Sequence, residues 1–428
     1  MSKVKLNLLF LCLFFVYTQG MWERTLFFLP DATYIVDVAI VAFIMFQFKW
    51  NPRTPGSKVF FAFLLTAFLV GITNSDSITE TFLYTRFTIY TYLIYVQVYN
   101  LGLDTKTWFR LLKFSVWMII IQVLGSLYTI FFLGEQIEGY VGLMSSSGGT
   151  TATIFPLFVS SIAFLYYLFR SQMLWKEWLI LLLVFLSAFL VGYASGKRGI
   201  YFTLPVFFII VLIMAFPILI KSGFFKRKLI GIVSITILLI PVLIFGIFNS
   251  RGLNYSLSGN ESYSEVVSNS FSFAEEYESA TDEYGRTIGR SNTTTQIIDK
   301  SLSDPTLFIS GVGYGTTKEE STMLRLGYGY GLVGFTRDLI SAGWIFSVLA
   351  VIFMSLIISR NHSVKLGLTK ILRRLILFIF LYTHFFYSSD FTVSLKINLL
   401  MVILLALINS PLHKNASLEV FTSNRLIK

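Results

Sequence analysis

The chain has 428 residues, of which 55% are hydrophobic and only 13% charged, and its mean hydropathy is +0.72. Soluble domains carry about 25% charged residues, so this composition excludes an ordinary soluble domain. A net charge of +11 is compatible with binding to nucleic acid or to anionic lipid. The distribution of the basic residues along the chain instead indicates that they set the orientation in a membrane, so we expect no nucleic-acid partner. The single cysteine, Cys12, excludes an intramolecular disulfide and a cysteine-based zinc site.

Apolar runs of about 20 residues recur along the whole length, which is typical of membrane-spanning segments. The runs are continuous rather than alternating, so they predict helices. The first run resembles a signal peptide, but no small-x-small cleavage site follows, so we interpret it as an uncleaved span. The sequence therefore predicts an all-α, polytopic membrane helical bundle of about 12 spans. The predicted spans are 6–20, 32–48, 59–73, 82–101, 114–133, 150–169, 178–195, 200–220, 229–248, 339–359, 371–387 and 395–410.

The basic residues follow the predicted topology. With the N-terminus inside, the inner segments carry 22 Lys or Arg against 3 acids, and the rest of the chain carries 12 against 20. An excess of Lys and Arg in short cytoplasmic segments sets membrane orientation. We therefore expect both termini to be cytoplasmic.

Lys197 and Arg198 break this distribution, because the predicted topology puts their tight turn, 194–199, on the outer side. The adjoining spans leave almost no loop to solvate them, and an arginine in mid-membrane costs about 2.5–3.5 kcal/mol on insertion scales. Two interpretations are open. The cations bind an anion at the outer membrane face, or their long side chains snorkel from a helix end to the interface.

Residues 249–328 form the only long polar stretch, with 11 of the 23 acidic and 6 of the 34 basic residues. Its first half, 251–282, is predicted to be a solvated surface excursion. In its second half we expect a helix over 293–302, capped by Ser291 or Asn292 and ended by the Asp304-Pro305 pair. The glycines that follow, Gly311, Gly313 and Gly315, give a backbone whose amide groups are expected to face an anion.

The chain is then expected to return to the membrane through a re-entrant or interfacial helix over 322–339, with Arg337 and Asp338 as an interfacial ion pair. The last outer turn contains Asp390, and His384 lies below it in the span 371–387. A lone histidine on an apolar helix is more often structural than catalytic. We divide the chain into a membrane bundle (1–248), a large outer loop (249–338) and a second membrane segment with a cytoplasmic tail (339–428).

Three features of the chain resemble the bacterial O-antigen polymerase and O-antigen ligase superfamily. They are the turn Ser195-Gly196-Lys197-Arg198-Gly199, one large outer loop late in the chain, and the order Gly289-Arg290, short helix, Asp304-Pro305, Gly311-Val312-Gly313. The motif resemblance covers residues 195–345, and the rest matches only in span layout.

The resemblance implies a GT-C-like bundle with a periplasmic loop, in the bacterial inner membrane. It implies an undecaprenyl-diphosphate-linked oligosaccharide as substrate, membrane lipids as surroundings, and a chain-length regulator and a flippase as pathway partners. It implies that Arg198 and Arg290 hold the substrate diphosphate as catalytic residues, with no cofactor and no metal. Further substrate contacts are expected from Lys197, Arg286, Gly311, Gly313, Arg325, Arg337 and His384.

One departure from the family pattern favours the polymerase branch. Ligases carry a His-x-Asn type motif shortly after the glycines, whereas this chain reads Lys318-Glu319-Glu320-Ser321. The general base that deprotonates the acceptor hydroxyl stays open between Glu319, Glu320 and Asp390.

The sequence thus favours an inverting glycosyltransferase that polymerises lipid-linked repeat units, with Tyr314, Tyr328, Tyr330 and Trp344 able to stack on sugars. Two alternatives are enzymes: an O-antigen ligase, or a transferase that uses polyprenyl-phosphate sugar with Glu23 or Asp31 as base. A third is a flippase for the same lipid-linked sugars, although transporters favour internal repeats and none is evident here.

Overall fold

The computed structural model describes residues 3–25, 33–46, 48–74, 78–101, 105–133, 142–144, 149–168, 173–197, 199–221, 225–249, 289–314, 332–359, 367–387 and 395–410. Within these ranges every regular element is helical. Among them, six helices are long and apolar enough to cross a membrane: Ser57–Asn74, Arg110–Tyr128, Trp175–Ala194, Gly199–Pro217, Lys228–Gly246 and Gly334–Ser359. The chain is therefore a helical, membrane-embedded protein, as its composition predicts.

A helix occupies each of the twelve predicted segments. In chain order these are α1 (Lys3–Tyr17), α3 (Thr33–Met45), α4 (Ser57–Asn74), α5 (Ile78–Leu101), α6 (Thr105–Leu133), α7 (Gly149–Leu168), α8 (Trp175–Ala194), α9 (Gly199–Lys221), α10 (Phe225–Asn249), α16 (Gly334–Ser359), α17 (Gly367–Leu381) and α18 (Leu395–Asn409). The predicted helices are confirmed. Of the others, α1, α3, α7 and α18 are apolar but shorter, so the number of spans stays a prediction.

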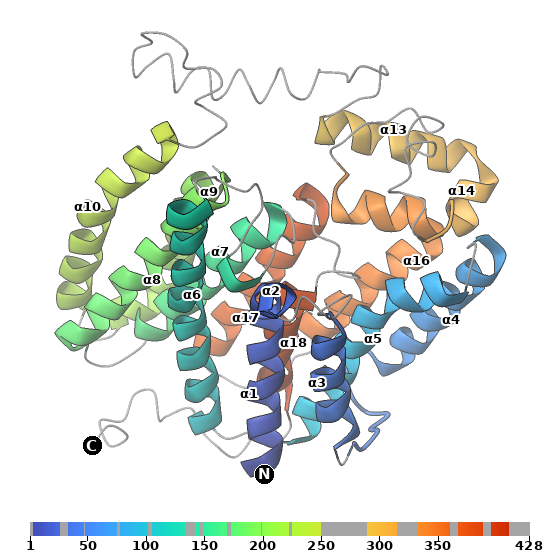
Figure 1. The fold of residues 1–428 in the computed structure, drawn as a ribbon, viewed down its shortest axis with the longest axis horizontal. Helices are drawn as coiled ribbons and strands as arrows, with labels where there is room; N and C mark the ends of the chain where they lie inside the picture. The colour runs from blue at the N-terminus through green and yellow to red at the C-terminus, as the bar shows by residue number, and fades with distance from the viewer. Residues whose placement is uncertain are drawn as a thin grey trace.

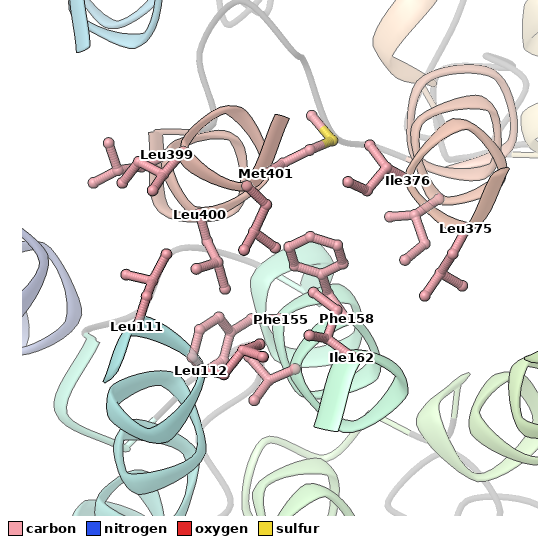
Figure 2. Close-up of a cluster of buried hydrophobic side chains, with 14 of the residues drawn as sticks. Leu111, Leu112, Phe155, Phe158, Ile162, Leu375, Ile376, Leu399, Leu400 and Met401 are labelled. Carbon is pink, nitrogen blue, oxygen red and sulfur yellow. The ribbon is translucent and has the colours of Figure 1, made fainter. Parts of the chain in front are cut away.

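The core lies where helices from both halves of the chain meet. Figure 2 shows side chains of α6, α7, α17 and α18 converging, with Phe155 and Phe158 of α7 between Leu112, Ile376 and Leu400. All five side chains are buried. Contacts of this kind are individually weak but numerous, so they fix the late helices against the early ones.

A buried polar network ties the same helices together at one end. Asn409 on α18 donates to the Tyr95 hydroxyl (3.0 Å) and to the Ile357 carbonyl (2.8 Å), and it accepts a bond from Arg373 (2.8 Å). Ser410 donates to the Tyr99 carbonyl at 3.1 Å. Buried polar groups need such partners, so this network fixes how α5, α16, α17 and α18 meet.

Two helices of the predicted outer loop form a separate layer, α13 (Arg290–Ser303) and α14 (Pro305–Ser310). Figure 1 shows them above α16 at the upper right, while the start of α1 lies at the bottom. The predicted helix over 293–302 and its end at Asp304 are confirmed. The predicted cap is wrong, because Gly289 is the N-cap of α13. Asp304 also begins α14, since its side chain accepts bonds from the amides of Thr306 and Leu307.

The two-helix layer docks on a break in α16. Gly343 has non-helical angles (φ 77°, ψ −176°), so α16 consists of two helical pieces. The Ile340 and Ser341 carbonyls next to the break accept bonds from the amides of Val312 (2.7 Å) and Gly313 (3.2 Å). Trp344 donates to the Ser301 hydroxyl at 2.9 Å. These bonds join α13 and α14 rigidly to a helix that is long enough to span the membrane.

Candidate functional site

The candidate site is built around Arg290, which is the first residue of α13. Its guanidinium carbon lies 4.6 Å from the centroid of the Tyr387 ring, which is the distance of a cation–π contact. The N-terminus of a helix is itself electropositive. A positive charge at that position repels the helix dipole, so the arginine and the helix start together attract an anion.

Tyr387 joins Arg290 to three further segments. The Tyr387 hydroxyl lies 3.2 Å from the Thr153 hydroxyl in α7. Its carbonyl accepts a bond of 3.1 Å from the amide of Gly334, the first residue of α16. Its ring lies 6.0 Å from the ring of Tyr382. Tyr387 follows directly after a π-helical turn, Tyr382–Phe386, at the end of α17. Such turns are frequent at functional sites.

The turn between α8 and α9 reaches the same tyrosine. Gly196 has a left-handed φ of 63°, and the amide of Lys197 donates to the Gly192 carbonyl at 3.0 Å, which closes the end of α8. Gly199 then starts α9. A Cβ added there would lie 3.6 Å from the Thr153 hydroxyl oxygen and 3.7 Å from the Tyr387 hydroxyl. The turn with Lys197 and the Arg290 end of α13 therefore meet at Tyr387.

The first residues of α9, α13 and α16 lie around Tyr387, together with Thr153, the fifth residue of α7. The first amides of a helix lack intrahelical acceptors and carry partial positive charge. Together with the start of α13, the guanidinium of Arg290 makes this end of the helix electropositive. Such a site favours a phosphate or diphosphate over a neutral ligand.

The glycine run does not present amides to an anion. The amides of Gly311, Val312 and Gly313 donate to the carbonyls of Leu307, Ile340 and Ser341. Gly311 (φ 64°) and Gly313 (φ 102°) are left-handed, and a Cβ would strike the Ile340 carbonyl at the first and the Asn74 carbonyl at the second. The expectation that these amides face an anion is therefore wrong. The glycines allow close packing against α16 and α4.

His384 lies in the π-helical turn and is fully buried. Its ring stacks on Phe380 at 5.4 Å and meets the edge of Phe335 at 6.0 Å. Neither ring nitrogen has a hydrogen-bond partner among the described residues. The ring exposes no surface, so in this conformation it does not reach a substrate, and the substrate contact that we predicted for it has no support in the geometry.

Arg337 and Asp338 lie in the first turn and a half of α16. Arg337 is partly exposed, whereas Asp338 is fully buried. Burial and, next, the negative charge of Asp338 raise the pKa of the Tyr314 hydroxyl above its ordinary value. Tyr314 is also fully buried and packs on Phe346 (6.1 Å). The expectation that Tyr314 stacks on sugars is therefore wrong. Trp344 is partly buried and bonded to α13.

Several predicted site residues lie outside the described residues: Asp31, Arg198, Arg286, Gly315, Glu319, Glu320, Arg325, Tyr328, Tyr330 and Asp390. Among the described ones, the structure brings Arg290 to Tyr387 directly and Lys197 through its turn. Gly311 and Gly313 lie at the far end of α13 and α14.

Sequence reasoning missed Tyr387 and an ion pair inside the bundle. Arg86 on α5 contacts the Asp37 carboxylate on α3 at 3.0 Å, and both side chains are largely buried. Opposite charges near the same ends of two predicted spans were a usable signal for the ion pair. For Tyr387 the only signal is an aromatic residue at the end of a span beside a polar turn.

In comparisons with known proteins, no protein-family model matches the chain, and no curated protein matches it at a significant level.

Proposed function

We propose that this chain is an O-antigen or capsular polysaccharide polymerase. It would be an inverting membrane glycosyltransferase that moves a growing glycan from polyprenyl diphosphate to the next lipid-linked repeat unit. The observation that carries the proposal is the meeting of Arg290 and the turn of Lys197 at Tyr387, where α9, α13 and α16 begin, in a membrane-embedded protein.

The chemistry of the site supports this activity. In the proposed reaction the acceptor hydroxyl gives its proton to a base and attacks the anomeric carbon of the donor sugar. The bond between that carbon and the diphosphate oxygen breaks, and the diphosphate leaves with its electron pair. Negative charge grows on the leaving group, and fixed cations stabilise that charge most in the transition state. Arg290, with Arg198 from the α8–α9 turn, would hold the diphosphate by paired N–H groups. Glu320 or Asp390 would act as base.

The proposal includes a topology. The bundle would be GT-C-like with twelve spans, with both termini in the cytoplasm of a bacterial cell and the segment 249–338 on the periplasmic face of the inner membrane. The proposed partners are the lipid-linked oligosaccharide, a chain-length regulator and a flippase of the same pathway.

Deletion in the host tests the activity against its alternatives. The surface polysaccharide is separated on a gel before and after deletion and after complementation with the wild-type chain. A ladder that collapses to a band of one repeat unit, and is restored by the wild type, supports polymerisation. Loss of all surface glycan contradicts it and favours ligation or flipping, and accumulation of substrate in the inner leaflet identifies the flippase.

A further inference from the structure

A polar groove lies at the opposite end of α13 from Arg290. It has a volume of about 640 Å³ and lies between the α13–α14 junction, the end of α4 and the glycine run. Cavities of about 300–1,000 Å³ are typical of small-ligand sites. Ten residues separate Arg290 from Lys300, which lines the groove, and this separation corresponds to about 15 Å along the helix.

The side chains that line the groove suit a ligand rich in hydroxyl groups. Asp304 Oδ1 accepts from the Thr306 amide at 2.8 Å, while Oδ2 accepts no hydrogen bond from any described residue. Lys300 supplies an ammonium group, and Thr306 an exposed hydroxyl. Among the described residues that line the groove, one carboxylate and one ammonium leave no net charge, so this part of the groove does not favour phosphate. Sugar hydroxyls both donate and accept, as this set of groups requires.

The groove is held in shape by bonds within the protein. Asn74 Nδ2 donates to the Ser310 hydroxyl (2.6 Å) and to the Gly311 carbonyl (3.0 Å), which joins α4 to the end of α14. Asp304 is fixed as the cap of α14, and Ser303 donates to the Lys300 carbonyl at 3.0 Å. A site that is ordered before the ligand arrives loses less entropy on binding.

We propose that this groove binds neutral sugar residues of the oligosaccharide whose diphosphate the Arg290 end of α13 holds. This inference deepens the proposed function and rests on it. The two sites divide recognition between them. The Tyr387 region recognises a charge common to all such substrates, and the groove recognises sugars that differ between repeat units.

The test is a binding measurement on the purified full chain in detergent. The probe is the free oligosaccharide that mild acid releases from the lipid-linked pool of the host, without lipid or diphosphate, and saturation-transfer NMR detects its binding. Thr306→Trp fills the groove, Asp304→Asn removes the carboxylate charge but keeps a capping side chain, and Thr295→Trp adds the same bulk on the exposed surface of α13. Arg290→Ala alters only the diphosphate end.

We expect the wild type, Thr295→Trp and Arg290→Ala to bind equally, and Thr306→Trp and Asp304→Asn to raise Kd about tenfold or more. No binding by the wild type at millimolar probe, or equal binding by Thr306→Trp, overturns the inference. Displacement of the probe by inorganic pyrophosphate also overturns it, because the groove would then be an anion site. The deletion experiment has its own readout, so the proposed function can survive a negative binding result.

Discussion

Tyr387 gives the sharpest prediction about the site, because one side chain makes two separable contacts. The Arg290 guanidinium carbon lies 4.6 Å from the centroid of the Tyr387 ring, and the Tyr387 hydroxyl lies 3.2 Å from the Thr153 hydroxyl. A cation–π contact contributes about 0.5–2 kcal/mol. If that energy positions Arg290 for the leaving diphosphate, Tyr387→Leu slows polymerisation by about 2- to 30-fold, at 1.36 kcal/mol per factor of ten. Tyr387→Phe keeps the ring and loses only the hydroxyl bond, so its rate should stay within about twofold of wild type.

The assay is the initial rate of polymer formation in membrane vesicles supplied with lipid-linked repeat units. Thermal unfolding of both purified variants separates a positioning effect from a loss of folded protein. If Tyr387→Leu reacts at the wild-type rate, or Tyr387→Phe loses as much activity as Tyr387→Leu at equal stability, the contact between the ring and Arg290 does not position the arginine.

Three further predictions concern stability. Gly311→Ala places a Cβ against the Ile340 carbonyl at a left-handed φ, so it should destabilise the fold by about 2 kcal/mol or more. Gly199→Ala is the control: its Cβ meets nothing closer than 3.6 Å, so it should unfold near the wild-type temperature. Equal melting temperatures for Gly311→Ala and Gly199→Ala would contradict the packing role of Gly311. Asn409→Ala removes a shared partner of Arg373, Tyr95 and the Ile357 carbonyl and should cost about 1–3 kcal/mol in the same assay; an unchanged melting temperature would show that the network is dispensable. Asp304→Ala should lower the free energy of unfolding by about 1 kcal/mol through the lost helix cap, and it should speed amide hydrogen exchange at the start of α14. Asp304→Asn keeps a capping side chain and should show neither effect. Identical exchange rates in the two variants would refute the capping role.

The helices were predictable because their signal is local. Every predicted apolar segment contains a helix, and the Asp304-Pro305 pair ends α13 as expected. What the sequence did not reveal depends on partners far away in the chain. The break at Gly343 is stable because the amides of Val312 and Gly313, about 30 residues earlier, bond the carbonyls beside it. No local pattern contains that pairing.

The same distinction applies to the site. The turn of Lys197 was singled out because its charges oppose the predicted topology, and Arg290 because of the family resemblance, and the structure brings both to one place. The glycine run was misinterpreted, because the same glycine pattern is compatible with two structures. In one the backbone amides are free to bind an anion, and in the other the backbone packs closely on a neighbouring helix. Tyr387 was overlooked because aromatic residues are common throughout this chain, and only the fold distinguishes this one.

The measurement that tests the central claim most directly is polymerisation by the purified chain in proteoliposomes with lipid-linked repeat units as the only substrate. Arg290→Ala is compared with Arg374→Ala, an exposed arginine on α17. We predict that the wild type and Arg374→Ala convert the substrate to a ladder of longer glycans, and that Arg290→Ala leaves it as single repeats at equal folded content. A full ladder from Arg290→Ala, or none from the wild type, contradicts the assignment of this site to glycan polymerisation.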